Sequence, residues 1–415
     1  MAIAIVLATG ACASDAAPTV SPSAVATILP TAAAATAGTT PTASPLPAPG
    51  HELYGFVPYW EMDDTIAAHL ATTPLSTIGL FSVTHTGKGV LNPRTKGYAK
   101  VTGDVGRTII REAHERGTRV ELVYTTFGRA KNTKLFENAG LQGSVIAALV
   151  ALAGDLGVDG INVDVEGLDP MLVPAYGSFV GALRDAVVAA DAGDRVSVAT
   201  GAGPLGAAMA AAATTEGADR VFLMGYDYRT PGSSPGATSP LENRDGSGRL
   251  SLRWSLDMYD ALGVPADRLL LGLPLYGITW PVAGPEIGAP ETGRGAAWIL
   301  RRHLDVLTDP TLVPERDETE VVEVYALPAP APSAPIASTG VPSAPGASAS
   351  ASASADSVPA WSAIYVDSPD TLTRKLGLSE ERGLAGAGFW AIGYERGLPG
   401  YTQAMRDYVA RGATP

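Results

Sequence analysis

Eight short runs of β-branched and aromatic residues recur along the chain, and stretches with helical periodicity lie between most of them. The expected strands span residues 53–60, 77–84, 119–126, 158–166, 195–200, 220–227, 269–276 and 386–393. The expected helices span residues 105–116, 144–156, 175–190, 205–215, 252–262 and 398–410. Up to the seventh strand the repeat averages roughly 36 residues, which is enough for a strand, a helix and their loops. Eight such units predict a closed (β/α)8 TIM barrel of the α/β class, with its chemistry at the carboxyl ends of the strands.

Two segments of the 415-residue chain have compositions that cannot form a core. Residues 13–50 consist almost entirely of Ala, Thr, Pro and Ser, and we expect them to be a disordered tether. The barrel domain is expected to follow over residues 51–415. A second low-complexity stretch, at about 327–359, is rich in Ala, Pro and Ser. It falls between the seventh and eighth expected strands, so we expect that crossover to be elaborated by a long surface insertion.

The amino terminus carries a pattern typical of an exported protein. A short apolar run at residues 3–8 is followed by TGAC at residues 9–12. Small residues directly before a Cys are typical of bacterial lipoprotein signals. We therefore expect residues 1–12 to be a signal segment, with Cys12 lipidated and the protein held at the outer face of a cell membrane. An ordinary export signal, which would give a secreted protein, is the alternative.

Composition excludes several classes of function. The chain has 29 Lys+Arg against 42 Asp+Glu, a formal net charge of −13, and no clustered basic run, so we do not expect it to bind nucleic acid. A single Cys excludes a Cys-rich metal site, and the five His are scattered without a His-x-x-x-His pair. We expect a monomer that uses neither a metal nor a cofactor.

The fourth expected strand carries the strongest functional signal. It reads DGINVDVE at residues 159–166, so Asn162, Asp164 and Glu166 share one face while the opposite face is apolar. In a barrel the apolar face packs on the helices and the polar face points into the lumen. Three polar side chains spaced ~6.5–7 Å apart are costly to bury without a use for them. The pattern therefore predicts a functional pair of carboxylates, with Glu166 nearest the open end.

Three weaker motifs compete with this interpretation. Residues 162–167 resemble the start of a calcium loop, but Val173 stands where that loop needs a bidentate Glu. GAGPLG at residues 201–206 fits a dinucleotide fingerprint, yet it falls in the fifth βα unit instead of opening a doubly wound sheet. GSSPG at residues 232–236 mimics a nucleophile elbow without its flanking strand and helix. The loop around it, residues 229–249, is expected to form one wall of a cleft instead.

Four motifs together resemble glycoside hydrolase family 18, the chitinase-like enzymes. The fourth strand matches the family's Asp-Gly-x-Asp-x-Asp-x-Glu, except that Asn162 stands at the first Asp of the Asp-x-Asp-x-Glu core. MGYD at residues 224–227, residues 263–277 and FWAIGY at residues 389–394 match the sixth, seventh and eighth strands of the family. The resemblance covers roughly residues 53–411. The Asn variant is most similar to the branch of bacterial spore-cortex and cell-wall N-acetylglucosaminidases.

The resemblance implies a retaining, substrate-assisted mechanism on polymers of N-acetylglucosamine, in which the 2-acetamido oxygen of the substrate attacks the anomeric carbon. It implies Glu166 as general acid and base, and Asp164 as the residue that holds the acetamido N–H. Tyr226 would donate to the acetamido oxygen, and Trp390 would form the floor beneath the sugar. Asn162, Asp227 and Met224 are further expected substrate-binding residues. We also expect the aromatic residues at the ends of predicted strands to stack on sugar faces, namely Tyr59, Trp60, Tyr276 and Trp280.

The sequence leaves the substrate open among chitin, peptidoglycan and N-glycan cores, and it leaves exo or endo action open as well. The alternative class is a non-catalytic, lectin-like protein on the same barrel. The presence of Glu166 favours the enzyme, because a lectin has no need of a proton donor. Asn162 suggests a further hypothesis. Without a second acid at this position, Asp164 should ionise more readily than it would beside an Asp.

Overall fold

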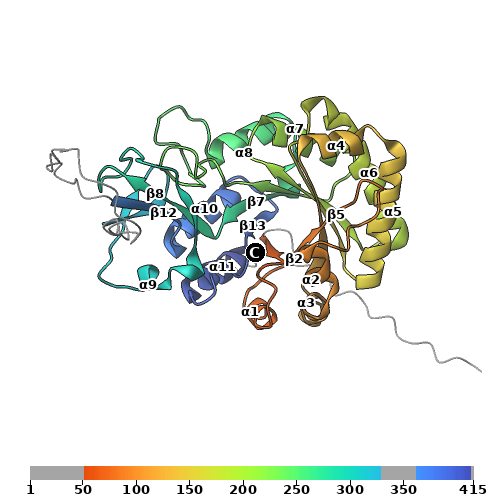
Figure 1. Ribbon diagram of the computed structural model, residues 1–415, viewed down its shortest axis with the longest axis horizontal. Coiled ribbons are helices and arrows are strands. Elements are labelled where there is room, and N and C mark those ends of the chain that lie inside the picture. Colours follow the sequence, from red (N-terminus) through yellow and green to blue (C-terminus); the bar gives the residue numbers. More distant parts are fainter. Residues whose placement is uncertain (1–50, 329–360, 413–415) are drawn as a thin grey trace, which may run out of the picture. The chain divides into compact units, whose positions relative to one another are not determined.

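A closed barrel of eight parallel strands forms the centre of the computed structural model, which describes residues 51–328 and 361–412 (Figure 1). The strands follow the order β1-β13-β7-β6-β5-β4-β3-β2 around the barrel, and β1 closes it by pairing with both β13 and β2. Their bounds are β1 (Glu52–Pro58), β2 (Thr77–Val83), β3 (Arg119–Phe127), β4 (Gly160–Glu166), β5 (Arg195–Gly201), β6 (Arg220–Met224), β7 (Leu269–Pro274) and β13 (Gly386–Trp390). The predicted (β/α)8 fold is confirmed.

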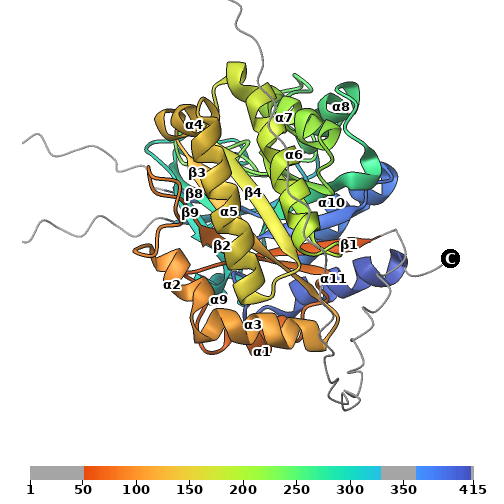
Figure 2. The ribbon, with the colours of Figure 1, turned by 90° about the vertical axis from the view of Figure 1, so that its right-hand side faces the viewer.

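Helices cover the outside of the barrel (Figure 2). They are α1 (Ile66–Leu70), α2 (Lys96–Thr102), α3 (Asp104–Glu115), α4 (Arg129–Phe136), α5 (Ala139–Leu156), α6 (Val173–Ala190), α7 (Pro204–Thr215), α8 (Leu252–Ala261), α10 (Pro369–Glu381) and α11 (Pro399–Gly412). A further short helix, α9 (Leu304–Leu307), lies in the connection from β7 to β13. All six expected helices are present. The sequence analysis missed the three short helices α1, α2 and α9, and also α4 and α10.

Local signals explain where the barrel helices begin and end. The Asn138 side chain accepts a hydrogen bond from the Leu141 N–H at the start of α5, and Gly157 ends that helix in a left-handed conformation. A capping box between Ser368 and Thr371 starts α10. Helix α5 and the segment Pro170–Ala190 are apolar and long enough to cross a membrane. Both lie on the barrel, and their buried side chains belong to the core between helices and strands.

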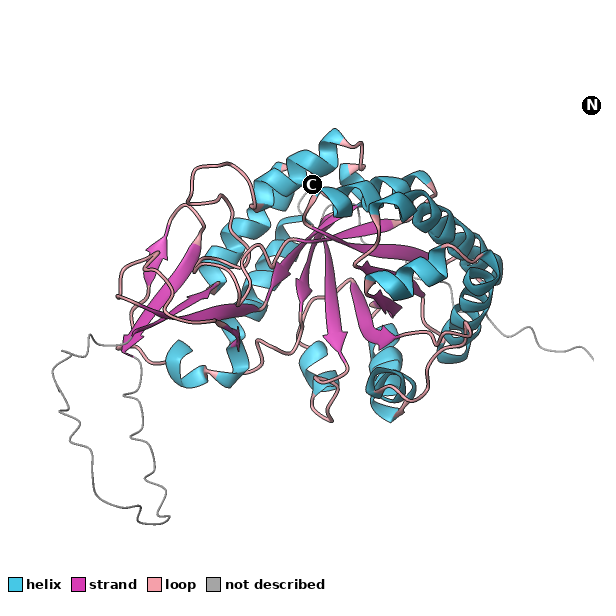
Figure 3. Ribbon diagram, turned by 45° about the horizontal axis from the view of Figure 1, so that its top comes forward, coloured by secondary structure: helices cyan, strands magenta, loops and turns pink. Residues whose placement is uncertain are grey.

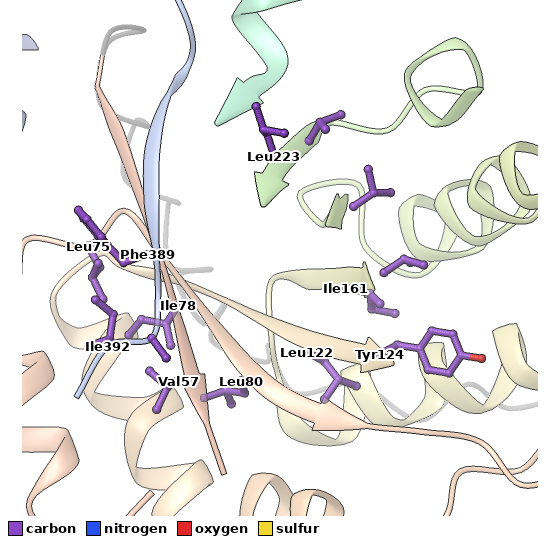
Figure 4. Close-up of a cluster of buried hydrophobic side chains, with 14 of the residues drawn as sticks. Val57, Leu75, Ile78, Leu80, Leu122, Tyr124, Ile161, Leu223, Phe389 and Ile392 are labelled. Atoms are coloured by element: carbon purple, nitrogen blue, oxygen red, sulfur yellow. The ribbon is translucent and has the colours of Figure 1, made fainter. Parts of the chain in front are cut away.

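Outward-facing side chains of the barrel strands build the main core. Ile161, Val163 and Val165 are buried in it, as the alternation of β4 predicts. Figure 4 shows Ile161 on the same side of the sheet as Leu122 and Tyr124. A separate cluster of aromatic residues fills the lumen, where the rings of Phe56 and Phe222 meet edge to face, with 4.8 Å between their centroids. The barrel lumen is therefore filled by side chains.

The crossover from β7 to β13 contains a second, antiparallel sheet with the order β10-β11-β12-β8-β9 (Figure 3). Its strands are β8 (Tyr276–Val282), β9 (Ala296–Ile299), β10 (Glu315–Asp317), β11 (Val322–Pro328) and β12 (Trp361–Val366). The expected elaboration of this crossover is confirmed, but the folded sheet was not predicted.

The low-complexity stretch joins β11 to β12, which are neighbours in the second sheet. All but its first two residues lie outside the described part of the chain, as do the expected signal segment, Cys12 and the expected tether. These predictions therefore stay untested.

Candidate active site

A cavity of about 970 Å³ opens at the carboxyl ends of the barrel strands. Its wall contains every predicted catalytic and substrate-binding residue except Asn162 and Trp280. The predicted residues that line it are Tyr59, Trp60, Asp164, Glu166, Met224, Tyr226, Asp227, Tyr276 and Trp390. Side chains from β1, β2, β4, β6, β13 and their loops, far apart in sequence, therefore meet at one place.

The polar face of β4 ends in this cavity. Asp164 is buried, lying level with Thr125 of β3 and Ala199 of β5, whereas Glu166 is exposed at the rim. Burial raises the pKa of Asp164 well above its usual range, and the Glu166 carboxylate nearby raises it further. Although Glu166 reaches the cavity, the atoms packed around its carboxyl group partly desolvate it and raise its pKa, and the charge of Asp227 raises it further. A carboxyl group with a raised pKa, open to a cavity, is suited to donating a proton near neutral pH.

The backbone at Glu166 is held in place by its neighbours. Its carbonyl oxygen accepts hydrogen bonds from the Gly128 N–H at 2.9 Å and from Asn132 Nδ2 at 2.7 Å. The next residue, Gly167, has a φ of 72°, which a residue with a side chain rarely adopts. The strand therefore ends sharply after Glu166, and its backbone is fixed at the mouth of the cavity.

Tyr226 and Asp227 stand directly after β6. Burial raises the pKa of Tyr226 well above its usual range, so its hydroxyl stays neutral and able to donate. In the described part of the chain that hydroxyl has no hydrogen-bond partner, which leaves it free for a ligand. Asp227 has a φ of 61°, its N–H donates to Thr238 Oγ1 at 3.1 Å, and its Oδ1 accepts a hydrogen bond from the Tyr276 hydroxyl.

Aromatic rings form one side of the cavity. The Trp390 ring lies 4.8 Å from Phe81 and 6.1 Å from Trp60, edge to face in both cases. Trp60 donates from Nε1 to the Tyr394 hydroxyl at 3.0 Å while 44% of it stays exposed. These contacts fix the rings before any ligand arrives, which makes them suited to stacking against the apolar face of a sugar.

Two predicted substrate-binding residues are corrected by the structure. Trp280 is fully buried in the second sheet, where it packs against Tyr365 and donates from Nε1 to the Ser233 carbonyl at 2.9 Å. Asn162 points into the lumen as predicted, but it is fully buried and does not line the cavity. It donates from Nδ2 to Ser197 Oγ at 2.7 Å. Neither residue can touch a ligand in the cavity.

The wall predicted from loop 229–249 is only partly correct. Its last residue, Arg249, lines the cavity together with Leu250, but much of the loop packs on the second sheet. Arg244 pairs with Asp317 at 2.6 Å, and the Ala237 N–H donates to Glu320.

Sequence reasoning missed several lining residues, among them Phe81, Ser82, Lys96, Phe127 and Trp254. Phe127 is the last residue of β3, so the strand-end signal that identified Tyr59 could have found it. Residues 201–204 of the glycine-rich motif also line the cavity, as the turn from β5 into α7. Within residues 51–328 and 361–412, no group of three or more His, Cys, Asp or Glu side chains is arranged to hold a metal ion.

Comparison with known proteins identifies the family. A family model described as "Glycosyl hydrolases family 18" matches residues 123–395. Mouse chitotriosidase-1 is 26% identical over 191 residues, which are 41% of this chain and 41% of that protein. The match therefore spans well under half of this relative.

Solved structures show the same fold at low sequence identity. A GH18 chitinase from Cycas revoluta in complex with (GlcNAc)3 superposes with a TM-score of 0.68 at 17% identity, over 86% of this chain and 99% of that one. The spore cortex-lytic enzyme of Bacillus cereus gives 0.63 at 17% identity, over 86% of this chain and 74% of that one. A chitinase-like agglutinin from Robinia pseudoacacia gives a TM-score of 0.66 at 18% identity, over 86% of this chain and 99% of that one.

Proposed function

Because the chain belongs to glycosyl hydrolases family 18, we propose that it hydrolyses polymers of β-linked N-acetylglucosamine by a retaining, substrate-assisted mechanism. One observation carries the proposal: Glu166 ends the polar face of β4 at the mouth of the cavity, with a pKa raised by burial and by Asp227. The aromatic wall around Trp390 and the unpaired hydroxyl of Tyr226 support it.

In this mechanism the protein supplies one acid and no carboxylate nucleophile. Glu166 protonates the glycosidic oxygen as the acetamido oxygen of the substrate attacks the anomeric carbon, and the leaving sugar departs. The Glu166 carboxylate then takes a proton from the water that opens the oxazolinium ring, which restores the acid.

Three further side chains act on the acetamido group and the sugar ring. The Asp164 carboxylate accepts the acetamido N–H and stabilises the positive charge of the oxazolinium. The Tyr226 hydroxyl donates to the acetamido oxygen and holds it in line for attack. Trp390 supports the sugar ring from below.

A carbohydrate-binding protein without turnover is the second candidate. The similarity to the fold of an agglutinin favours it, because the same barrel occurs in a protein described in that way. The enzyme is the better-supported proposal. Glu166 is exposed to the cavity with a raised pKa, and binding alone gives no reason to keep a costly carboxyl there.

We also propose that the protein is exported and anchored through Cys12. The support is the sequence TGAC at residues 9–12 after a short apolar run. Fractionation of expressing cells tests this, because Cys12→Ala should move the protein out of the membrane fraction.

A panel of substrates tests the function itself. The full chain is incubated with chitin oligomers, purified peptidoglycan and an N-glycan core, and the products are weighed by mass spectrometry. Cleavage of one of them supports the enzyme, and the product masses identify the substrate and the bond. Retained binding to a glycan without any product would support the lectin-like alternative.

A further inference from the structure

A buried carboxyl group lies in the barrel lumen close to the site, and the mechanism above does not use it. Glu121 of β3 is 2% exposed, and it forms no ion pair with any described residue. Its Oε2 atom accepts hydrogen bonds from Ser197 Oγ at 2.5 Å and from the Tyr54 hydroxyl at 3.0 Å. Ser197 Oγ also accepts from Asn162 Nδ2 at 2.7 Å. Four buried side chains from β1, β3, β4 and β5 therefore form one hydrogen-bonded chain.

We propose that Glu121 is a positioning residue that acts through Ser197 on the Asn162 amide, so that the Asn162 carbonyl oxygen faces Asp164. The direction of each hydrogen bond carries the argument. Glu121 Oε2 accepts from two hydroxyl groups, so Ser197 gives its only hydroxyl proton to Glu121. Ser197 can then only accept from Asn162, which requires the amide nitrogen on that side.

Two side-chain oxygen atoms of β4 lack a hydrogen-bond donor. Asn162 Oδ1 and Asp164 Oδ1 are both buried, and neither has a hydrogen-bond partner in the part of the chain that the structure describes. The two residues occupy successive inward positions on one strand. A buried acceptor without a donor is costly, and an amide oxygen carries no proton to share. In the proposed arrangement a proton on Asp164 satisfies both atoms at once, because the Asp164 O–H would donate to the Asn162 carbonyl oxygen.

The titratable groups around Asp164 favour the same state. Burial and the Glu166 carboxylate raise the pKa of Asp164. Three tyrosines among the described residues are influenced by the Asp164 charge, and burial raises the pKa of each, so they stay neutral. They are Tyr54 of β1, Tyr226 of β6 and Tyr176 of α6.

Charges around Glu121 itself act in both directions. Burial raises the pKa of Glu121, whereas the hydrogen bonds from Ser197 and Tyr54 and the charges of Arg119 and Arg195 lower it. The net pKa of Glu121 is raised, so the acceptor role of Oε2 rests on geometry: the hydroxyl groups of Ser197 and Tyr54 both converge on this atom, and a proton taken up by the carboxyl group goes to Oε1.

The inference rests on the proposed function for its catalytic consequence. The reaction needs the Asp164 carboxylate to accept the acetamido N–H, so the ionisation of Asp164 sets the acidic limb of the pH profile of kcat/KM. The chain of hydrogen bonds from Glu121 then places that limb at a higher pH than Asp164 would show beside a freely turning amide.

The experiment titrates Asp164 directly in the full chain. The protein is labelled with carboxyl-¹³C aspartate, and Asp164→Asn assigns the signal. Ser197→Ala breaks the chain of hydrogen bonds and keeps the charge of Glu121, while Glu121→Gln removes that charge. Either change lets the Asn162 amide turn its N–H toward Asp164. We expect the pKa of Asp164 to fall by about one unit in both variants, and the acidic limb of kcat/KM to move with it.

Ser379→Ala is the matched control, because Ser379 is equally buried but hydrogen-bonds to Tyr408 and to the Leu376 carbonyl, away from the lumen. Its Asp164 titration should equal that of the wild type. A shift in Glu121→Gln alone would mean that Glu121 acts through its charge, and would overturn the proposal. An unchanged titration in both variants would overturn it as well. Should Glu121→Gln fail to fold, Ser197→Ala decides. A wild type that cleaves no glycan would refute the proposed function and leave the titration decisive for this inference.

Discussion

Tyr276 donates a hydrogen bond to Asp227 Oδ1, and this contact joins the first strand of the second sheet to the end of β6 beside the proposed catalytic acid. Asp227 is one of the charges that raise the pKa of Glu166. The second sheet therefore helps to fix a carboxylate that adjusts the acid. Its position in the crossover between β7 and β13 makes it part of the site as well as an addition to the barrel.

Removing the charge of Asp227 should narrow the pH range of activity. Glu166 must be protonated to act as an acid, so its pKa sets the alkaline limb of kcat/KM. In Asp227→Asn the like charge is lost, the pKa of Glu166 falls, and the alkaline limb moves to lower pH. The pH profile measures this shift, and Asp185→Asn, which removes an exposed carboxylate from the outer helix α6, is its control. An alkaline limb that stays in place would show that Asp227 does not adjust Glu166.

Asn162→Asp should move the acidic limb of the profile to higher pH. The new carboxyl would lie beside Asp164 and next to Ser197, which already donates to Glu121. Like charge raises the pKa of an acid, so Asp164 would ionise less readily. This result would support the hypothesis drawn from the sequence, that Asp164 ionises more readily beside Asn162 than it would beside an Asp. A profile identical to that of the wild type would refute it.

Trp390→Ala should raise KM by roughly fivefold or more, because an aromatic contact contributes ~1 kcal/mol beyond its buried area. The control is Trp280→Phe, which changes a tryptophan that lies outside the cavity. Trp280 loses its hydrogen bond to the Ser233 carbonyl in that variant, so stability should fall by about 1–3 kcal/mol with KM unchanged. Steady-state kinetics and thermal unfolding of both variants measure the contrast. Equal KM values in both would argue against Trp390 as a sugar platform.

Asp164→Asn should stabilise the protein while it lowers activity. The folded pKa of Asp164 lies well above its ordinary value of 3.8, so the folded state holds a proton that the unfolded state has lost. The free energy of unfolding therefore falls as the pH rises from the pKa of Asp164 in the unfolded state to its pKa in the folded state. Asn carries no titratable proton, so the variant lacks this loss of stability. Tm measured from pH 4 to pH 7 should fall less steeply in the variant. Equal slopes of Tm against pH in the two proteins would mean that burying the Asp164 carboxyl group does not destabilise the folded state.

The barrel could be predicted from the sequence because each of its strands has a recognisable pattern over neighbouring residues. The apolar side chains of β4, such as Ile161, alternate with polar ones over neighbouring residues, so the inward and outward faces are both readable. The second sheet lacks such a signal. Its first strand begins at Tyr276, two residues after β7 ends, and its short strands pair across long loops.

The errors at the site have the same origin. Strand alternation shows that Asn162 points inward, but its depth depends on the register with β5, where it lies opposite Ser197 below the cavity. The sequence predicts Trp280 at the end of a barrel strand because nothing nearby in the sequence shows that it belongs to another sheet. Glu121 carried no motif, and only the hydrogen bonds from Ser197 and Tyr54 reveal it.

The most direct test of the account compares wild type with Glu166→Gln on whichever glycan the wild type cleaves. Gln keeps the size of the side chain and removes the proton that the mechanism needs. We predict a loss of kcat/KM on the order of 10²- to 10⁴-fold, with binding of the glycan and Tm retained. Activity in Glu166→Gln equal to that of the wild type would contradict Glu166 as the acid and, with it, the proposed mechanism.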